Sequence, residues 1–119
     1  MEKTDAVAAL AALAQDNRLD VFRLLVEGGP EGLAAGAIAE RLSLAPNTLS
    51  FHFDRLRQAG LVTVKRDGRS LIYAARFETM NDLLSYLTEN CCGGDPSACA
   101  PVACRPKSST RAKKAKVPA

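Results

Sequence analysis

A turn of only three residues, Ser43 to Ala45, separates two short helical patterns, and this spacing limits the fold more than any other feature of the chain. The first pattern covers residues 33–42, and the second starts at Pro46. Proline suits the first position of a helix, because its missing N–H would have no partner there. The second pattern carries an apolar stripe at helical spacing, made of Leu49, Phe53 and Leu56. Two short helices joined by so tight a turn predict a helix-turn-helix.

A β-hairpin is expected directly after the second helix, which Gly60 should end. Residues 61–75 form two β-rich runs around Asp67-Gly68, a strong signal for a tight hairpin turn. Arg66 and Arg69 lie beside this turn. A helix-turn-helix followed by a basic-tipped hairpin predicts a winged helix, mainly α with a β-hairpin wing.

Two helices are expected before this unit and one after it. The first covers residues 5–15, with Asp5 as its N-cap. The second starts at a cap formed by Asp16 or Asn17 and stops at Gly28 and Gly29. The apolar residues expected to bring the second helix into the core are Leu19, Phe22, Leu25 and Val26. The inward positions of the helix over 33–42 are Ile38 and Leu42, and the last helix covers 77–90.

The net charge of +3 conceals two basic blocks. Residues 46–76 carry 6 basic and 2 acidic groups, and residues 105–119 carry 6 basic groups and no acidic ones. Such blocks are candidate contacts to a polyanion. No apolar run approaches the roughly 18 residues that a membrane span needs. The N-terminus mixes acidic and basic residues and is a poor signal peptide, so we expect a cytoplasmic protein with reduced cysteines.

The helix that starts at Pro46 presents a polar face opposite its apolar stripe. On a helical wheel this face contains Asn47, Phe51, Arg55 and Gln58, flanked by Thr48 and His52. Arginine can pair with guanine, asparagine and glutamine with adenine, and an aromatic ring can touch the thymine methyl. The side chains expected to reach phosphates or the adjacent minor groove are Thr48, Ser50, Arg57, Arg66 and Arg69. The plainer alternative is a solvated face on which Phe51 packs against a neighbour, but the adjoining wing and basic block favour DNA contact.

Enzyme chemistry is not supported by the sequence. His52 is the only histidine, and the cysteines lie in a different element. A catalytic triad is therefore excluded, and His52 is interpreted as a polar residue of the recognition helix. No glycine-rich phosphate loop is present, and no organic cofactor is expected.

These features together resemble the arsenic-repressor (ArsR-type) winged-helix family. The resemblance covers residues 5 to about 90 and rests on NRLDVFRLLVEG, LAPNTLSFHFDRLRQAGLV and KRDGRSLIY. It implies a homodimer, built from the first and last helices, that binds operator DNA and leaves it when a metal or metalloid binds. The side chains expected at that dimer interface are Val7, Leu10, Leu13, Met80, Leu83, Leu84 and Leu87.

Two ligand sets of this family are missing from the chain. The founding arsenite sensors carry cysteines in the helix before the recognition helix, where this sequence has Ala34, Gly36 and Ala39. The zinc-, nickel- and cobalt-sensing relatives use Asp and His of the last helix, which here has no histidine. All four cysteines instead lie within 91–104. This arrangement resembles the arsenite-responsive repressors whose thiols follow the last helix.

Cys91, Cys92 and Cys99 are therefore the predicted ligands of As(III) or Sb(III). Soft thiolates select soft centres, and three sulfurs on one loop suit a pyramidal metalloid. A disulfide between the adjacent Cys91 and Cys92 would be strained. Cys104 can replace Cys99, add a fourth ligand or have no role. The expected organisation is a DNA-binding and dimerisation domain at 1–90, a cysteine-rich segment at 91–104 and a basic, disordered tail at 105–119.

Several alternatives remain open at this point. Structural zinc prefers C-x2–4-C pairs, which this spacing does not match. Cadmium or lead could bind the same thiols, and methylarsenicals need only two of them. A redox switch could pair Cys91 or Cys92 with Cys99 or Cys104. The chain could also be a metalloid scavenger without specific DNA binding, or a DNA-binding regulator without an inducer.

Overall fold

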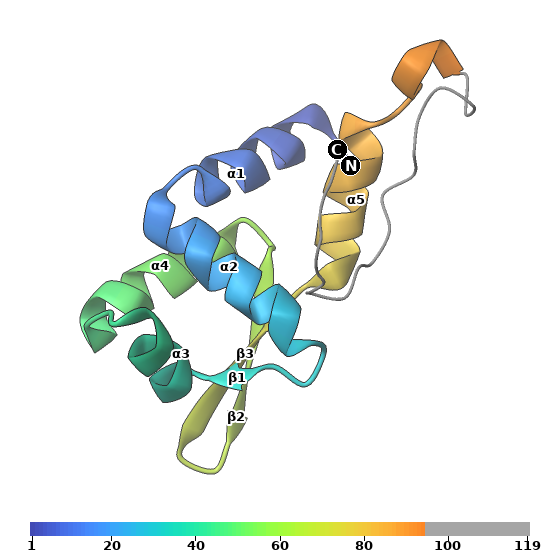
Figure 1. Ribbon diagram of the computed structural model, residues 1–119. Helices are drawn as coiled ribbons and strands as arrows, with labels where there is room; N and C mark the ends of the chain where they lie inside the picture. The colour runs from blue at the N-terminus through green and yellow to red at the C-terminus, as the bar shows by residue number, and fades with distance from the viewer. Residues whose placement is uncertain (95–119) are drawn as a thin grey trace, which may run out of the picture. The chain divides into compact units, whose positions relative to one another are not determined.

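The structure is a computed structural model that describes residues 1–94 (Figure 1). The chain divides into two compact units after Glu89. The elements follow one another as α1 Lys3–Leu13, α2 Asp16–Gly28, β1 Leu33–Ala34, α3 Ala35–Leu42, α4 Pro46–Gln58, β2 Val62–Asp67, β3 Ser70–Ala75, α5 Phe77–Leu87 and the short 3-10 turn η1 Cys91–Gly94. The predicted winged helix-turn-helix, mainly helical with a β-hairpin, is confirmed. No helix within residues 1–94 is long and apolar enough to cross a membrane.

The wing is an antiparallel hairpin of β2 and β3, and β1 adds a third strand beside β3 (Figure 1). Asp67 pairs with Ser70, so the two loop residues are Gly68 and Arg69. The turn is therefore one residue later than the predicted Asp67-Gly68. Gly68 has a φ of 64°, which glycine adopts without the strain that a side chain would cause.

The core of the first unit lies between α2, the helix-turn-helix and the start of the wing. Its largest fully buried side chains are Val21, Leu25, Ile38, Leu56 and Leu61. Phe53 of α4 stacks on Tyr73 of β3, with ring centroids 3.6 Å apart and planes 9° apart. This contact joins the recognition helix to the wing, so the two elements keep one relative position.

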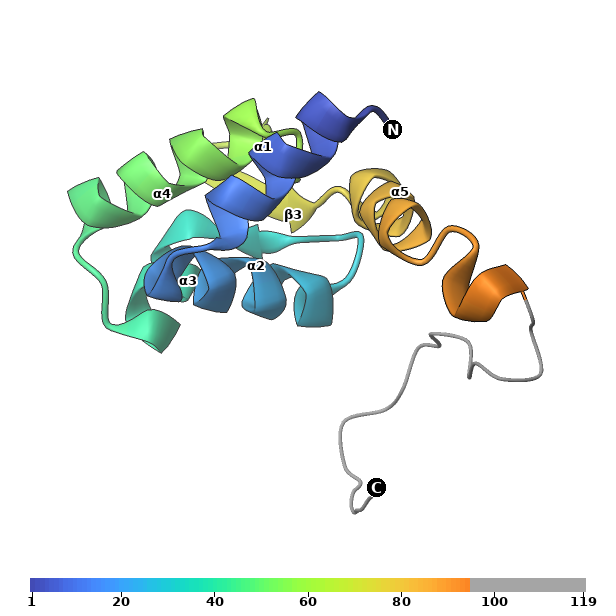
Figure 2. The same cartoon turned by 90° about the horizontal axis from the view of Figure 1, so that it is seen from above.

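The first helix packs through alanines. Ala6, Ala9 and Ala12 are buried, while Val7 and Leu10 are 57% and 42% exposed. The small side chains of these alanines let α1 lie close to α2 and α4 (Figure 2). Val7 and Leu10 therefore face away from the core of their own chain, whereas Leu13 at the end of α1 packs against it.

The N-cap residues of the first two helices lie one to three residues before the predicted ones. Glu2 is the N-cap of α1, and Asp5 lies inside the helix, where its carboxylate accepts the Glu2 N–H at 3.3 Å. Gln15 is the N-cap of α2, and its Oε1 accepts the Arg18 N–H at 2.9 Å. The predictions missed both because glutamate and glutamine are less common caps than aspartate or asparagine.

Two further predictions are wrong, one about packing and one about secondary structure. Leu19 is 44% exposed, and the fully buried neighbour is Val21, because α2 is turned toward α4 and β3. Leu33 and Ala34 form a strand and not the start of a helix, since they pair with Tyr73 and Ile72 of β3. The helix before the turn therefore begins at Ala35.

Leu25→Ala tests the core. Leu25 is completely buried, so its truncation should lower the free energy of unfolding by about 2–5 kcal/mol. Leu71→Ala is the matched control, because Leu71 is 38% exposed on the wing and should change stability by no more than about 0.5 kcal/mol. Urea unfolding followed by circular dichroism measures both, and equal losses would contradict the described core.

Candidate functional site

The turn between α3 and α4 directs the recognition helix. Ser43 closes α3 in the left-handed conformation, with φ 54° and ψ 44°. Ala45 is the extended N-cap residue of α4, and Pro46 occupies its first turn as predicted. The apolar stripe of α4 is buried, so the opposite face of the helix must point outward.

That outward face is open to solvent in the described structure. The predicted DNA-facing residues of α4 that are exposed are Asn47, Thr48, Ser50, Phe51, Arg55, Arg57 and Gln58. The face is therefore polar and basic, with one aromatic ring within it. A solvent-exposed helix face with these groups can supply hydrogen bonds to base edges and phosphates.

Phe51 does not pack away against a neighbour. Its side chain is 52% exposed, and the guanidinium carbon of Arg55 lies 5.2 Å from the centroid of its ring. Arg57, by contrast, forms an ion pair with Asp54 of the same helix at 3.1 Å. The two arginines of α4 are thus held by different partners, one by a ring and the other by a carboxylate.

His52 is the predicted DNA-facing residue that the structure places elsewhere. It is only 5% exposed, because it follows the buried stripe and not the outward face. Its Nδ1 is buried and has no hydrogen-bond partner among the described residues. Its ring meets the ring of Phe51 edge-on, with centroids 5.8 Å apart at 61°. His52 therefore supports Phe51 from inside the protein.

Burial lowers the pKa of His52 below its ordinary value, because the charged imidazolium loses water. The positive charge of Arg18 lowers this pKa further. Arg18 also donates from Nε to the carbonyl oxygen of Ala12 at 2.6 Å, so it closes the end of α1. The sequence did not single out Arg18, whose effect depends on how α2 packs against α4.

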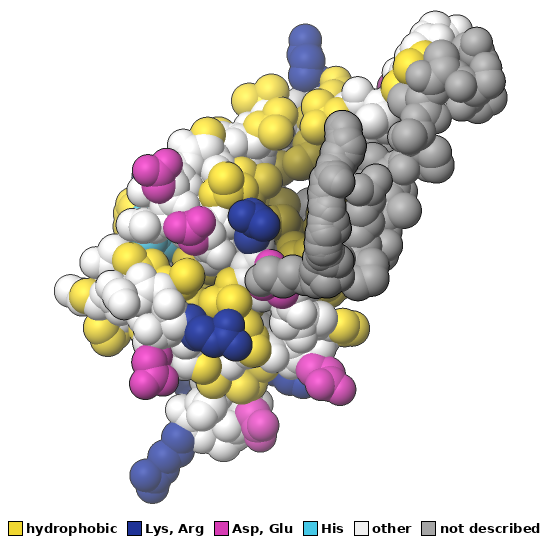
Figure 3. All heavy atoms as spheres, in the orientation of Figure 1, with side chains coloured by type: hydrophobic (Ala, Val, Ile, Leu, Met, Phe, Trp, Pro, Cys, Tyr) yellow, Lys and Arg dark blue, Asp and Glu magenta, His cyan; other side chains and the backbone are white. Residues whose placement is uncertain are grey.

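The two ends of the predicted interface differ in their surroundings. Gln58 lines two shallow hollows with α1, beside Ala8 in both, so it lies next to another helix. At the other end, Arg66 and Arg69 are exposed on the wing, as is Lys65, which the sequence analysis did not name although it belongs to the same basic block. Figure 3 shows a basic side chain at the tip of the wing.

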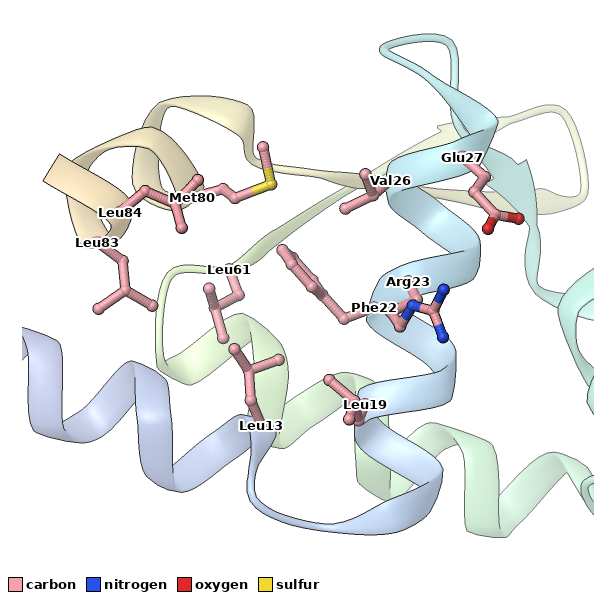
Figure 4. Close-up of a pocket in the computed structure, with 10 residues that line it drawn as sticks. All are labelled: Leu13, Leu19, Phe22, Arg23, Val26, Glu27, Leu61, Met80, Leu83 and Leu84. Carbon is pink, nitrogen blue, oxygen red and sulfur yellow. The ribbon is translucent and has the colours of Figure 1, made fainter. Parts of the chain in front are cut away.

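An apolar groove lies between the end of α1, α2 and α5 (Figure 4). It has a volume of about 400 Å³ and is lined by Leu13, Leu19, Phe22, Arg23, Val26, Glu27, Leu61, Met80, Leu83 and Leu84. Four predicted dimer residues are therefore brought together here. Leu83 is only 6% exposed and belongs to the core of its own chain. Val7, Leu10 and Leu87 are exposed.

The first two cysteines lie just beyond α5, in the second unit. Their sulfur atoms are 3.5 Å apart, much longer than a disulfide bond of about 2.05 Å, so the two thiols are not joined to each other. Cys92 is exposed and has a φ of 56°. Within residues 1–94 no three cysteine, histidine or acidic side chains converge on one point. Cys99 and Cys104, the other predicted ligands, lie outside the described residues.

The buried His52 should make stability depend on pH. The unfolded chain holds histidine at its ordinary pKa of about 6.5, while the folded pKa is lower. Between these values the unfolded state binds more protons, so the free energy of unfolding should fall as pH decreases from 7 toward 5 and level off below the folded pKa. Above about pH 7 the contribution is complete.

The measurement is urea unfolding at several pH values, compared with His52→Gln. The variant should lose the part of the pH dependence that comes from protonation of the His52 imidazole below about pH 7. Parallel pH profiles for the two proteins would show that the imidazole titrates alike in the folded and unfolded chains.

Comparison with known proteins agrees with this architecture. A family model described as a helix-turn-helix domain matches residues 13–65. The chain is 34% identical to the uncharacterized HTH-type transcriptional regulator YceK of Bacillus subtilis over 78 residues, which are 66% of this chain and 77% of YceK. It is 33% identical to the solved structure of HlyU from Vibrio cholerae, with a TM-score of 0.59, over 73% of this chain and 97% of that one.

A second solved structure, an ArsR-like transcriptional regulator from Rhodococcus, shares the fold with a TM-score of 0.66 at 23% identity, over 80% of this chain and 87% of that one. The names of these relatives describe regulators of transcription and not enzymes. With an outward face on α4, a basic wing and these relatives, the chain belongs to the HTH-type transcriptional regulators, and its fold is a winged helix-turn-helix.

Proposed function

We propose that this regulator is a metalloid-responsive repressor. It binds operator DNA as a homodimer and leaves the DNA when As(III) or Sb(III) binds Cys91, Cys92 and Cys99. The observation that carries this proposal is the pair of sulfur atoms 3.5 Å apart directly after the last helix of the DNA-binding unit. Thiolates bind soft ions in preference to hard ones, and histidine or carboxylate ligands are not needed.

The distance between the two sulfurs suits a shared ion. A thiolate binds a metal such as zinc at about 2.3 Å, so two sulfurs on one ion must lie less than about 4.6 Å apart. Cys91 and Cys92 meet this condition. A pyramidal metalloid needs one more thiolate, which Cys99 supplies in the proposal, and Cys104 is its possible substitute.

The DNA-binding surface is assigned to the outward face of α4 and the wing. In this proposal Asn47, Phe51, Arg55 and Gln58 face the bases of the major groove, and Thr48, Ser50 and Arg57 reach phosphates. Arg66 and Arg69 lie along the adjacent minor groove or backbone. His52 is removed from this set, because its burial leaves it to support the helix from inside.

The dimer interface is assigned to α1, α5 and the groove between α1, α2 and α5. Val7, Leu10 and Leu87 are 57%, 42% and 55% exposed and lie on the two helices concerned. Exposed apolar residues gathered on one surface of a small protein are typical of a subunit interface. A chain of 119 residues buries a limited share of its surface by itself, so a partner of the same kind adds stability.

Leu10→Glu tests the dimer. A charge at this exposed apolar position should leave the fold intact, because the side chain is outside the core, but should convert the dimer to a monomer. Analytical ultracentrifugation measures the mass. Leu71→Glu on the wing is the control and should stay dimeric, and a monomeric wild type would contradict the proposal directly.

In this proposal DNA is released through thermodynamic linkage between the metalloid site and the DNA-binding surface. Metalloid ligation joins Cys91 and Cys92 to Cys99 and shifts the two winged domains of the dimer relative to each other. Half-sites about one helical turn apart then no longer match the two recognition helices. Couplings of this kind are typically about 1–3 kcal/mol, a change of 5- to 150-fold in DNA affinity.

The function is tested by fluorescence anisotropy with a labelled duplex from the region upstream of the protein's own gene. Arsenite should weaken binding by the wild type about 5- to 150-fold. Cys91→Ser should bind the same duplex with unchanged affinity but keep that affinity when arsenite is added. Ser85→Ala, on the exposed surface of α5, is the control and should respond as the wild type does.

The same titration separates the alternatives. Release by cadmium, lead or an oxidant but not by arsenite would replace the metalloid with another thiol chemistry. Arsenite binding without specific DNA binding would identify a scavenger. Arsenite release that persists unchanged in Cys91→Ser would place the sensing site elsewhere.

A further inference from the structure

We propose that Phe51 and Arg55 act as one unit that reads a thymine beside a guanine in the operator. The inference rests on the proposed DNA-binding face of α4 and specifies which base step this face selects. The observation behind it is the cation–π contact between the Arg55 guanidinium and the exposed ring of Phe51, 5.2 Å from carbon to centroid.

The ring orients the guanidinium before DNA arrives. Phe51 and Arg55 are four residues apart on α4, a spacing that places side chains one above the other on a helix. The guanidinium carbon lies over the ring, and a cation–π contact of this kind uses none of the N–H groups as donors to a protein acceptor. An arginine can form two hydrogen bonds through these N–H groups to O6 and N7 of guanine.

The ring itself is held from below. The buried imidazole of His52 meets the Phe51 ring edge-on, with ring centroids 5.8 Å apart. The Phe51 ring therefore contacts both His52 and the guanidinium of Arg55. Phe51 remains 52% exposed, so part of its apolar surface is available for contact with DNA. In the major groove the apolar group available to it is the thymine methyl.

The spacing of the two side chains fits neighbouring base pairs. Residues four apart on a helix face lie about 5–6 Å apart at Cβ, and stacked base pairs are about 3.4 Å apart. This separation falls between one and two base-pair steps, so the flexible side chain of Arg55 must close the difference to reach the base next to a thymine that the phenyl ring contacts. The unit selects thymine and guanine at adjacent positions in each half-site.

Arg57 provides the natural comparison. Its guanidinium is bound to Asp54 at 3.1 Å and lies on no ring among the described residues, so it is directed by a charge and not by stacking. An arginine held in this way suits a phosphate contact. Arg55 and Arg57 share residue type, helix and exposure, and they differ in the partner that orients them.

The test starts with selection of bound sequences from a random pool of duplexes of about 24 base pairs, with the full chain and no metalloid. The wild type should enrich adjacent thymine and guanine in each half-site. In the selected duplex, uracil for that thymine removes only the methyl and should weaken binding about fourfold per half-site. Replacing that guanine by 7-deazaguanine removes only N7 and should weaken binding at least fivefold.

Three variants separate the parts of the unit. Arg55→Met keeps apolar contact with the ring but has no N–H, so it should bind the guanine and 7-deazaguanine duplexes equally. Phe51→Leu keeps an apolar group for the methyl but has no ring, so it should lose most of the guanine discrimination while keeping sensitivity to uracil. Arg57→Met should retain the discrimination at both bases and only reduce the salt dependence of binding.

The outcomes distinguish this inference from the function on which it rests. Guanine discrimination that is unchanged in Phe51→Leu would overturn the coupled unit while leaving DNA binding intact. Enrichment of a site without adjacent thymine and guanine would do the same. Failure of the wild type to enrich any sequence would count against the DNA-binding proposal as well. Circular dichroism checks that the variants fold, as their exposed positions lead us to expect.

Discussion

Burial of the apolar stripe of α4 is the constraint on which the rest of the molecule depends. Leu49 and Phe53 are 2% exposed, Leu56 is completely buried, and Phe53 also stacks on Tyr73 of the wing. A helix anchored along one side cannot rotate about its axis without exposing these groups to water, at a cost of about 1.5–3 kcal/mol for each large side chain. The opposite side of α4 is therefore presented outward in one orientation, together with the wing.

This anchoring also explains the unusual position of the only histidine. His52 is buried, and its Nδ1 has no hydrogen-bond partner among residues 1–94, which lowers the stability of the fold. Its ring contacts the exposed ring of Phe51, and the charge of Arg18 is near enough to lower its pKa. A residue on the buried face of α4, His52, thus helps to position a residue on its exposed face, Phe51. A substitution at His52 should therefore also affect Phe51.

The proposed sensing site is separate from the DNA-binding unit in the chain. The division after Glu89 places the paired thiols in the second unit, a few residues beyond α5. In the proposed mechanism α5 is the connecting element, since one of its faces joins the core through Leu83 and its end leads to Cys91. HlyU shares the winged-helix fold of this chain.

The sequence by itself determined the helix-turn-helix, the hairpin and the buried stripe of α4, because proline, glycine and helical spacing act over a few neighbouring residues. It also identified most of the exposed face of α4, the two wing arginines and the adjacent thiols. Only the tertiary structure decided that His52 is inside, that Val21 replaces Leu19 in the core, that Leu33 and Ala34 pair with β3, and that α1 packs through alanines. Each of these depends on which element lies opposite, and local periodicity contains no information about a partner that is distant in the chain. The same limit applies to Phe51 and Arg55, since their spacing was legible in the sequence, whereas the support of the ring by a buried imidazole required the folded helix.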